Sequence, residues 1–225
     1  MQAADSDTAM LARWEQRFLD YLATHFDSTD ASHDTGHFSR VWRHAQKIAA
    51  GEGGTADQLI LLTAAYFHDF VSLPKNHPDR AQSSLLCATR VRTLLQQDFP
   101  DFPAAKIEGV CHAIHAHSFS AGVRPRTPEA CILQDADRME ALGAIGLSRV
   151  FYIAGQLGTG LFDAADPLAR HRTPDDRLYA LDHFRIKLLQ LPALMRTATG
   201  RRIAGAEAAY LQSFLDKINT EISGS

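Results

Sequence analysis

Apolar residues recur at steps of three and four along most of this chain, and this spacing constrains the fold more than any other feature. Between residues 10 and 25, for example, Leu11, Trp14, Phe18 and Leu22 would share one face of a helix. No stretch shows the two-residue alternation of apolar and polar side chains that is typical of a half-buried strand. The sequence therefore predicts an all-α protein in which amphipathic helices share a core.

The same pattern defines the segments that we expect to be helical, and polar residues, glycines and prolines separate them. These segments are 10–25, 37–50, 57–70, 81–97, 104–117, 129–137, 141–154, 178–195 and 201–222. The longest predicted loops are 71–80 and 155–176, and long loops in compact domains often carry function. No shift in composition marks a boundary, so we expect one domain over 1–225, with a core at about 30–145 and the helices of 146–225 packed on it.

Charge and hydropathy exclude several classes of protein. The formal net charge is -3 and the sequence pI is about 6.4, which does not favour general nucleic-acid binding. The longest apolar run, 59–67, is about half of the roughly 18 residues that a membrane helix needs, so we expect no membrane partner. The cysteines are too widely spaced for a metal-binding pair and are expected to be small buried side chains in a reducing cytoplasm: Cys87, Cys111 and Cys131.

Four ionisable residues stand at the starts or ends of predicted helices. His37 opens one helix, His68 and Asp69 follow the apolar run 59–67, and Asp137 ends another predicted helix. Charged residues next to buried apolar segments are costly unless they are paired or bind a metal. Two imidazoles and two carboxylates form a mixed nitrogen and oxygen shell, which suits Mn, Fe, Co, Ni or Mg with water in the open positions. We therefore predict a metal centre.

The order of these residues resembles the H…HD…D signature of the HD superfamily of metal-dependent phosphohydrolases. The matching motifs are HFSRV at 37–41, AAYFHD at 64–69 and DADR at 135–138. The chain also resembles a bacterial subgroup of HD-domain hydrolases whose substrates are unassigned, in the segments 113–120, 134–146 and 183–189. The resemblance thus spans roughly residues 30 to 200.

The resemblance implies an HD-type helical domain with a C-terminal helical extension and one or two divalent ions, for which Zn is also compatible. It implies that the metal ligands are His37, His68, Asp69 and Asp137, and that Asp69 orients or deprotonates the attacking water. Some members of the superfamily hold a second ion with histidines between the HD pair and the last aspartate. Candidates for that second metal, or for a substrate contact, are His117 and His112.

Basic side chains near these motifs are candidates to bind phosphate. Arginine binds phosphate oxygens through two parallel hydrogen bonds, whereas lysine acts as a point charge. Lys75 and Arg80 directly follow the HD pair, and we predict that they act in catalysis. Arg40, beside the first motif, and Arg138, after the last aspartate, are further phosphate-binding candidates.

The function most consistent with these features is a metal-dependent phosphohydrolase, either a phosphomonoesterase or a phosphodiesterase. Its expected substrate is a small phosphorylated molecule such as a nucleotide, which metal-activated water would cleave. Two alternatives stay open: a non-enzymatic regulatory or binding module that contains a metal, and a diiron oxygenase of HD type. The C-terminal helices from Leu178 are candidates to cover the pocket or to form a homodimer. The sequence identifies neither the substrate nor the native metal.

Overall fold

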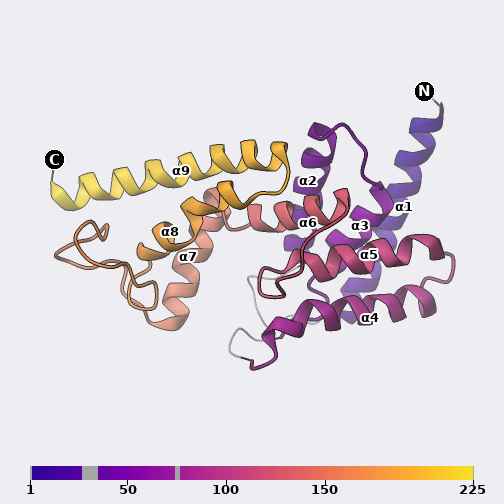
Figure 1. Ribbon diagram of the computed structural model, residues 1–225, viewed down its shortest axis with the longest axis horizontal. Coiled ribbons are helices and arrows are strands. Elements are labelled where there is room, and N and C mark those ends of the chain that lie inside the picture. Colours follow the sequence, from indigo (N-terminus) through magenta and orange to yellow (C-terminus); the bar gives the residue numbers. More distant parts are fainter. Residues whose placement is uncertain (1, 27–34, 74–76, 225) are drawn as a thin grey trace. The chain divides into compact units, whose positions relative to one another are not determined.

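The computed structural model describes residues 2–26, 35–73 and 77–224. It divides into two compact units, Met1–Asp137 and Arg138–Ser225, which are both helical (Figure 1). The described residues contain no strand, and a single isolated bridge pairs Gly160 with Tyr179. The all-α prediction is therefore confirmed.

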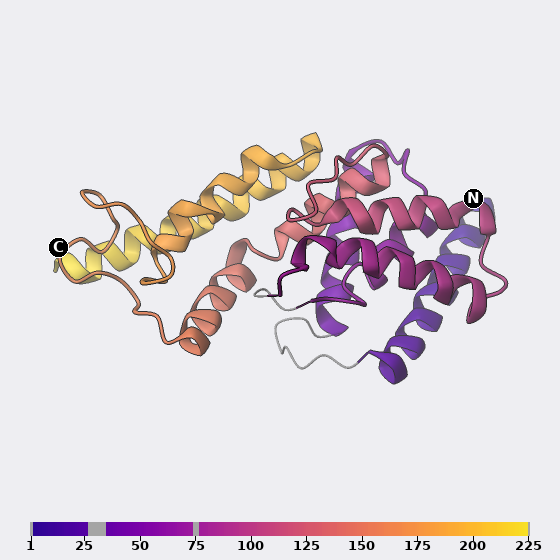
Figure 2. The same cartoon turned by 60° about the horizontal axis from the view of Figure 1, so that its bottom comes forward.

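The first unit, whose boundary after Asp137 falls in the last turn of α6, contains helices α1 to α6. They are α1 (Gln2–His25), α2 (Thr35–Gly51), α3 (Gln58–Phe67), α4 (Ser83–Gln97), α5 (Ala104–His117) and α6 (Pro128–Met139), with the short 3-10 helix η1 (Arg80–Gln82) before α4. Helix α3 packs against α1, α2 and α5, while α4 runs alongside α5 (Figures 1 and 2). Most bounds match the predicted segments to within a few residues, but α1 begins well before residue 10.

Helix α3 is the apolar centre of this unit. Eight of its ten residues are buried, including the polar Thr63, whose Oγ1 donates to the Leu59 carbonyl at 2.7 Å. The Asp57 carboxylate caps the first turn by accepting from the backbone N–H groups of Leu59 (3.0 Å) and Ile60 (3.1 Å). Burial of each large apolar side chain contributes about 1.5–3 kcal/mol, so a helix that is buried on all sides is held firmly. The helix ends at Phe67, and its position fixes where the next residues, His68 and Asp69, lie.

The second unit has its own helices and its own apolar core. Its helices are α7 (Gly143–Leu157), α8 (Asp182–Ile186) and α9 (Ala198–Ser223), and the 3-10 helix η2 (Leu188–Leu194) lies between α8 and α9. Three aromatic rings meet between them, with centroids 5.8 Å apart for Phe151 and Phe214 and 6.0 Å apart for Phe184 and Phe214. Helix α7 ends at Gly158, whose φ of 68° is a left-handed conformation that glycine adopts at little cost.

The prediction of one continuous helix over 178–195 is wrong. The segment instead forms α8 and η2, which are separated at Lys187, where φ is −131° and ψ is −58°. Pro192 lies inside η2 and has no backbone N–H to donate, so it disfavours a regular α-helix at this point. The apolar spacing in this segment is helical, as predicted, but residues 188–194 adopt the tighter 3-10 conformation.

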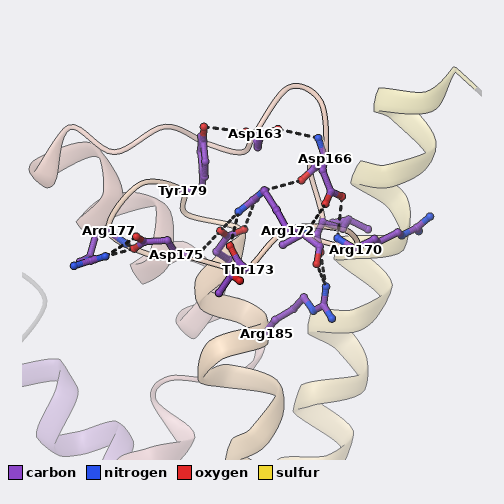
Figure 3. A network of polar contacts seen from close by, with 12 residues as sticks. Asp163, Asp166, Arg170, Arg172, Thr173, Asp175, Arg177, Tyr179 and Arg185 are labelled. Carbon is purple, nitrogen blue, oxygen red and sulfur yellow. Dashed lines mark hydrogen bonds and ion pairs between the residues drawn. The ribbon is translucent and has the colours of Figure 1, made fainter.

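The long loop between α7 and α8 is held by a polar network (Figure 3). The Asp166 carboxylate accepts from the backbone N–H groups of Arg170 (2.8 Å), His171 (2.7 Å) and Arg172 (3.1 Å). The Arg172 guanidinium in turn binds both oxygens of the buried Asp182 carboxylate, at 2.5 and 2.7 Å. These contacts order a loop that the sequence predicted only as long and polar.

Two further expectations concern the cysteines and membrane crossing. Cys87 and Cys111 are buried free thiols, and Cys131 is partly buried. None of the described helices combines the length and the apolar character that a membrane crossing requires.

Candidate metal centre

Three separate segments of the first unit bring ionisable side chains to one place. His37 lies in the first turn of α2, His68 and Asp69 follow α3, and Asp137 lies near the end of α6. The Nε2 atoms of His37 and His68 are 3.1 Å apart. The Asp137 Oδ1 atom lies 3.6 Å from the His68 Nε2 and 3.7 Å from the His37 Nε2. The Asp69 Oδ2 atom lies 3.8 Å from the same His68 nitrogen, so the structure brings together all four predicted ligands.

The positions of these donor atoms fit a single divalent ion. His37, His68 and Asp69 each offer one ligand atom, and these atoms lie within 4.8 Å of one another. Two nitrogens bound at about 2.1 Å and at right angles to each other lie about 3 Å apart, close to the separation of the two imidazoles. The mixed nitrogen and oxygen set suits Mn, Fe, Co or Ni better than an ion that prefers oxygen alone.

The orientation of the His68 ring is set by the helix that precedes it. Its Nδ1 atom lies 2.9 Å from the Ala65 carbonyl oxygen, which can only accept, so Nδ1 carries the proton. The second nitrogen, Nε2, is directed toward His37 and Asp137 and would be unprotonated when it binds a metal. A hydrogen bond at the second ring nitrogen is the usual way in which proteins orient a metal-binding histidine.

Charge is concentrated in this cluster. Burial lowers the pKa of the His68 imidazole, but the carboxylates of Asp69 and Asp137 outweigh it and raise that pKa to about 9. Burial also raises the pKa of the Asp69 and Asp137 carboxyls, yet the imidazoles of His68, His117 and His37 together outweigh it and hold both pKa values well below the usual range. The side chains of Asp69 and Asp137 are 18 % and 30 % exposed, so the site is open to solvent on the carboxylate side.

Of the two histidines predicted as additional ligands, the structure brings one to the cluster. The His117 Nε2 atom lies 3.5 Å from the Asp69 Oδ1, and its ring centroid is 4.9 Å from that of His68. The His117 Nδ1 atom donates to the Ile114 carbonyl at 2.6 Å, which repeats the arrangement at His68. The His112 Nε2 atom instead accepts from the backbone N–H of Arg126 at 3.1 Å, in the loop after α5.

The basic residues predicted to bind phosphate have varied surroundings. The Arg80 guanidinium donates to the Leu73 carbonyl and to the Ser72 hydroxyl, within the segment that follows the HD pair. The Arg138 guanidinium donates to the Leu194 carbonyl at 2.7 Å, within the second unit. Arg40 is partly buried on α2, three residues after His37, and Lys75 lies outside the described residues.

Sequence reasoning missed one buried residue beside the site, Gln134. Its side-chain amide donates to the Ala116 carbonyl at 2.8 Å and so ties the end of α5 to α6. Because Gln134 and Asp137 are three residues apart, they lie on the same side of α6. A neutral polar residue on the core side of a predicted helix was the one signal that could have identified it.

Comparisons with known proteins agree with this arrangement. A family model described as the HD domain matches residues 35–142, a range that includes all four predicted ligands and His117. The uncharacterized protein YpgQ of Bacillus subtilis is 32% identical over 202 residues, which cover 87% of this chain and 88% of YpgQ.

Solved structures resemble the whole chain. The crystal structure of Bacillus subtilis YpgQ in complex with ADP has a TM-score of 0.68 and 26% sequence identity, covering 94% of this chain and 96% of that one. An HD-superfamily hydrolase from Bacillus thuringiensis has a TM-score of 0.73 and 25% identity, covering 96% and 100%. The ordered motifs, the shared fold and the family model together show that this chain belongs to the HD-domain family.

Proposed function

We propose that this HD-domain protein is a metal-dependent phosphohydrolase that cleaves a phosphate ester of a nucleotide or a similar small molecule. The observation that carries the proposal is the convergence of His37, His68, Asp69 and Asp137 on one position with a solvent-open side. Likeness to an HD-superfamily hydrolase supports a metal-dependent phosphohydrolase at the level of the family. The finer assignment rests on the donor set and its surroundings.

Each residue of the cluster has a distinct role in this proposal. His37 and His68 hold a divalent ion through their Nε2 atoms, and Asp137 holds it through a carboxylate oxygen. When bound, such an ion supplies a nucleophile at neutral pH by lowering the pKa of water from 15.7 to about 7. Asp69 directs one carboxylate oxygen toward His68 and the other toward His117. Asp69 is the fourth proposed ligand of the ion, and we also assign its carboxylate to orienting the attacking water.

A nucleotide is the substrate class that we propose. The solved structure of YpgQ holds ADP, and YpgQ resembles this chain over nearly its whole length. Phosphate oxygens need cationic partners beyond the metal, and the proposed partners are Arg40, Lys75, Arg80 and Arg138. Since an arginine has five donors, the contact of Arg80 with the Leu73 carbonyl leaves others to meet a phosphate.

The proposal is tested by phosphate release from purified protein that has been stripped of metal and reloaded. Nucleoside mono-, di- and triphosphates and simple phosphomonoesters are each incubated with the protein and Mn²⁺, Co²⁺, Ni²⁺ or Mg²⁺. We expect hydrolysis with at least one ion, and we expect His68→Ala and Asp137→Ala to reduce turnover by roughly 100-fold or more. The matched control is His171→Ala, because this exposed histidine lies in the loop of the second unit.

Two outcomes would replace the proposal by one of its alternatives. A protein that binds metal tightly yet hydrolyses none of these compounds would favour a non-enzymatic module. Oxygen consumption by the ferrous protein with an organic substrate would favour a diiron oxygenase.

A further inference from the structure

Helix α4 contributes no ligand to the candidate metal centre, yet two of its side chains bind the helix ends that present ligands. The Ser84 hydroxyl donates to the His115 carbonyl at 3.0 Å, near the end of α5. The Cys87 thiol donates to the Phe67 carbonyl at 3.1 Å, at the end of α3. Both side chains are buried, and because they are three residues apart they share one face of α4.

Both carbonyls that α4 contacts lie in the last turn of a helix, and that of Phe67 also accepts from the backbone N–H of Phe70 at 3.2 Å. The last four C=O groups of an α-helix have no partner within the helix. Phe67 directly precedes His68, and His115 lies two residues before His117. At both ends the imidazole already bonds the carbonyl three residues before it, at Ala65 and Ile114 respectively.

The ends of α3 and α5 therefore have the same pattern of hydrogen bonds. In each, an imidazole Nδ1 anchors the ring to its own helix, and an α4 side chain anchors that helix terminus. Since the rings are bound to the backbone, a shift of either helix end would move its ring with it. Side chains of a single helix thus bond both of the helix ends that carry the rings of His68 and His117, whose centroids are 4.9 Å apart.

The chain just beyond the HD pair is also bonded to α4. The backbone N–H of Val71 donates to the Cys87 Sγ at 3.5 Å, and that of Leu73 donates to the Ser83 hydroxyl at 3.0 Å. Cys87 therefore donates to the residue before His68 and accepts from the residue two after Asp69. These two hydrogen bonds of Cys87 restrain the backbone on both sides of the HD pair.

We propose that Ser84 and Cys87 are positioning residues of the metal centre, and this inference rests on the proposed function. They act through their hydrogen bonds to the carbonyls of His115 and Phe67. Cys87 sets the position of the HD pair, and Ser84 sets the position of His117 beside Asp69. Together they define the 3.5 Å approach of the His117 Nε2 to the Asp69 Oδ1 and hence the affinity for the metal.

The first test compares metal affinity among single variants of α4. Mn²⁺ binding to metal-free protein is measured by calorimetry, and the visible absorption spectrum is recorded with Co²⁺. We expect Ser84→Ala and Cys87→Ala each to weaken Mn²⁺ binding by about 10-fold, the lower end of the range for partners that orient metal ligands. Ser84→Thr and Cys87→Ser keep a donor, and we expect them to stay within about 3-fold of the unaltered protein.

Cys111→Ala is the matched control. The Cys111 thiol is buried and donates to the Ala88 carbonyl at 3.5 Å, so it joins α4 and α5 away from the end of α5 that carries His117. We expect this variant to melt at a lower temperature and to keep its Mn²⁺ affinity and Co²⁺ spectrum. If Ser84→Ala and Cys87→Ala also lower only the melting temperature, they act by packing alone and the proposal is overturned.

A second test separates the two routes. If Ser84 acts through the end of α5, its effect on Mn²⁺ affinity disappears when His117→Ala is already present, whereas the effect of Cys87→Ala persists. An undiminished effect of Ser84→Ala in that background would overturn the route that we assign to it. Failure of the unaltered protein to bind any divalent ion would contradict the metal centre itself, which distinguishes that failure from one confined to α4.

Discussion

The orientation of single side chains in the metal centre depends on the contacts that their polar atoms make with neighbouring groups. His68 uses Nδ1 to donate to the Ala65 carbonyl, which leaves Nε2 directed at that of His37, 3.1 Å away. Asp137 reaches both of these nitrogens with one oxygen, so its carboxylate stands between two imidazoles. A neutral amide at this position would keep the shape and lose the charge that draws a cation.

Asp137→Asn tests that distinction at the level of one atom. We expect Mn²⁺ affinity to fall by at least the roughly 10–100-fold that removal of an outer partner causes, because a ligand is lost directly. Calorimetric titration of metal-free protein measures the change. Asp20→Asn is the control, since Asp20 is an exposed residue of α1. An affinity equal to that of the unaltered protein would remove Asp137 from the ligand set.

At the scale of an element, α3 links stability to function because one helix is capped at its start and carries the HD pair at its end. The Asp57 carboxylate accepts from two backbone N–H groups of the first turn and pairs with Lys106 of α5. Burial raises the pKa of this carboxyl, but the bonds from Lys106 and from the Ile60 and Leu59 amides outweigh it and lower the pKa below its ordinary value.

We expect Asp57→Ala to lower the free energy of unfolding by about 1 kcal/mol at pH 7, whereas Asp57→Asn keeps most of the cap. Because the pKa is lowered in the folded protein, the stabilisation by the carboxylate is present above the ordinary pKa of 3.8. It is lost as the pH falls through the folded value. Urea denaturation at pH 7 and near pH 3 should therefore show a smaller penalty for Asp57→Ala in acid. A penalty independent of pH would contradict this account.

At the scale of the whole molecule, the chain consists of two compact units that divide after Asp137. All four proposed ligands and His117 lie in the first unit, and the second has its own aromatic core and its own polar loop. The single domain expected from the sequence, with residues 146–225 packed on a core at 30–145, stays a prediction. Within the second unit, the buried Asp182 binds Arg172 and the backbone N–H of Asp175.

Asp182→Ala should loosen the loop between α7 and α8. Its removal leaves the Arg172 guanidinium and the Asp175 amide without the carboxylate that they share, so the loop should open more often. Limited proteolysis followed by mass spectrometry should show faster cleavage within 159–181 than in the unaltered protein. Asp216→Ala, on the surface of α9, is the control and should leave the cleavage rate unchanged.

Much of this protein could be predicted from its sequence, because helix formation depends on local spacing and the order of motifs is itself linear. The apolar run before His68 and Asp69 predicted a buried helix that ends at the HD pair, and α3 confirms it. Likewise, the order of His37, the HD pair and Asp137 indicated the HD family, which the comparisons show. Each of these inferences needs only residues that are close in sequence or read in order.

Tertiary structure alone decided which distant groups meet. His117 and His112 were both candidates on one predicted helix, with His117 the better match, but only packing brings His117 beside Asp69, while His112 accepts from the backbone N–H of Arg126. The partners of the α4 donors and of the Gln134 amide could not be predicted either, because they are backbone carbonyls of other helices. Periodicity determines which side of a helix is buried, but the packing of helices against one another determines what that side touches.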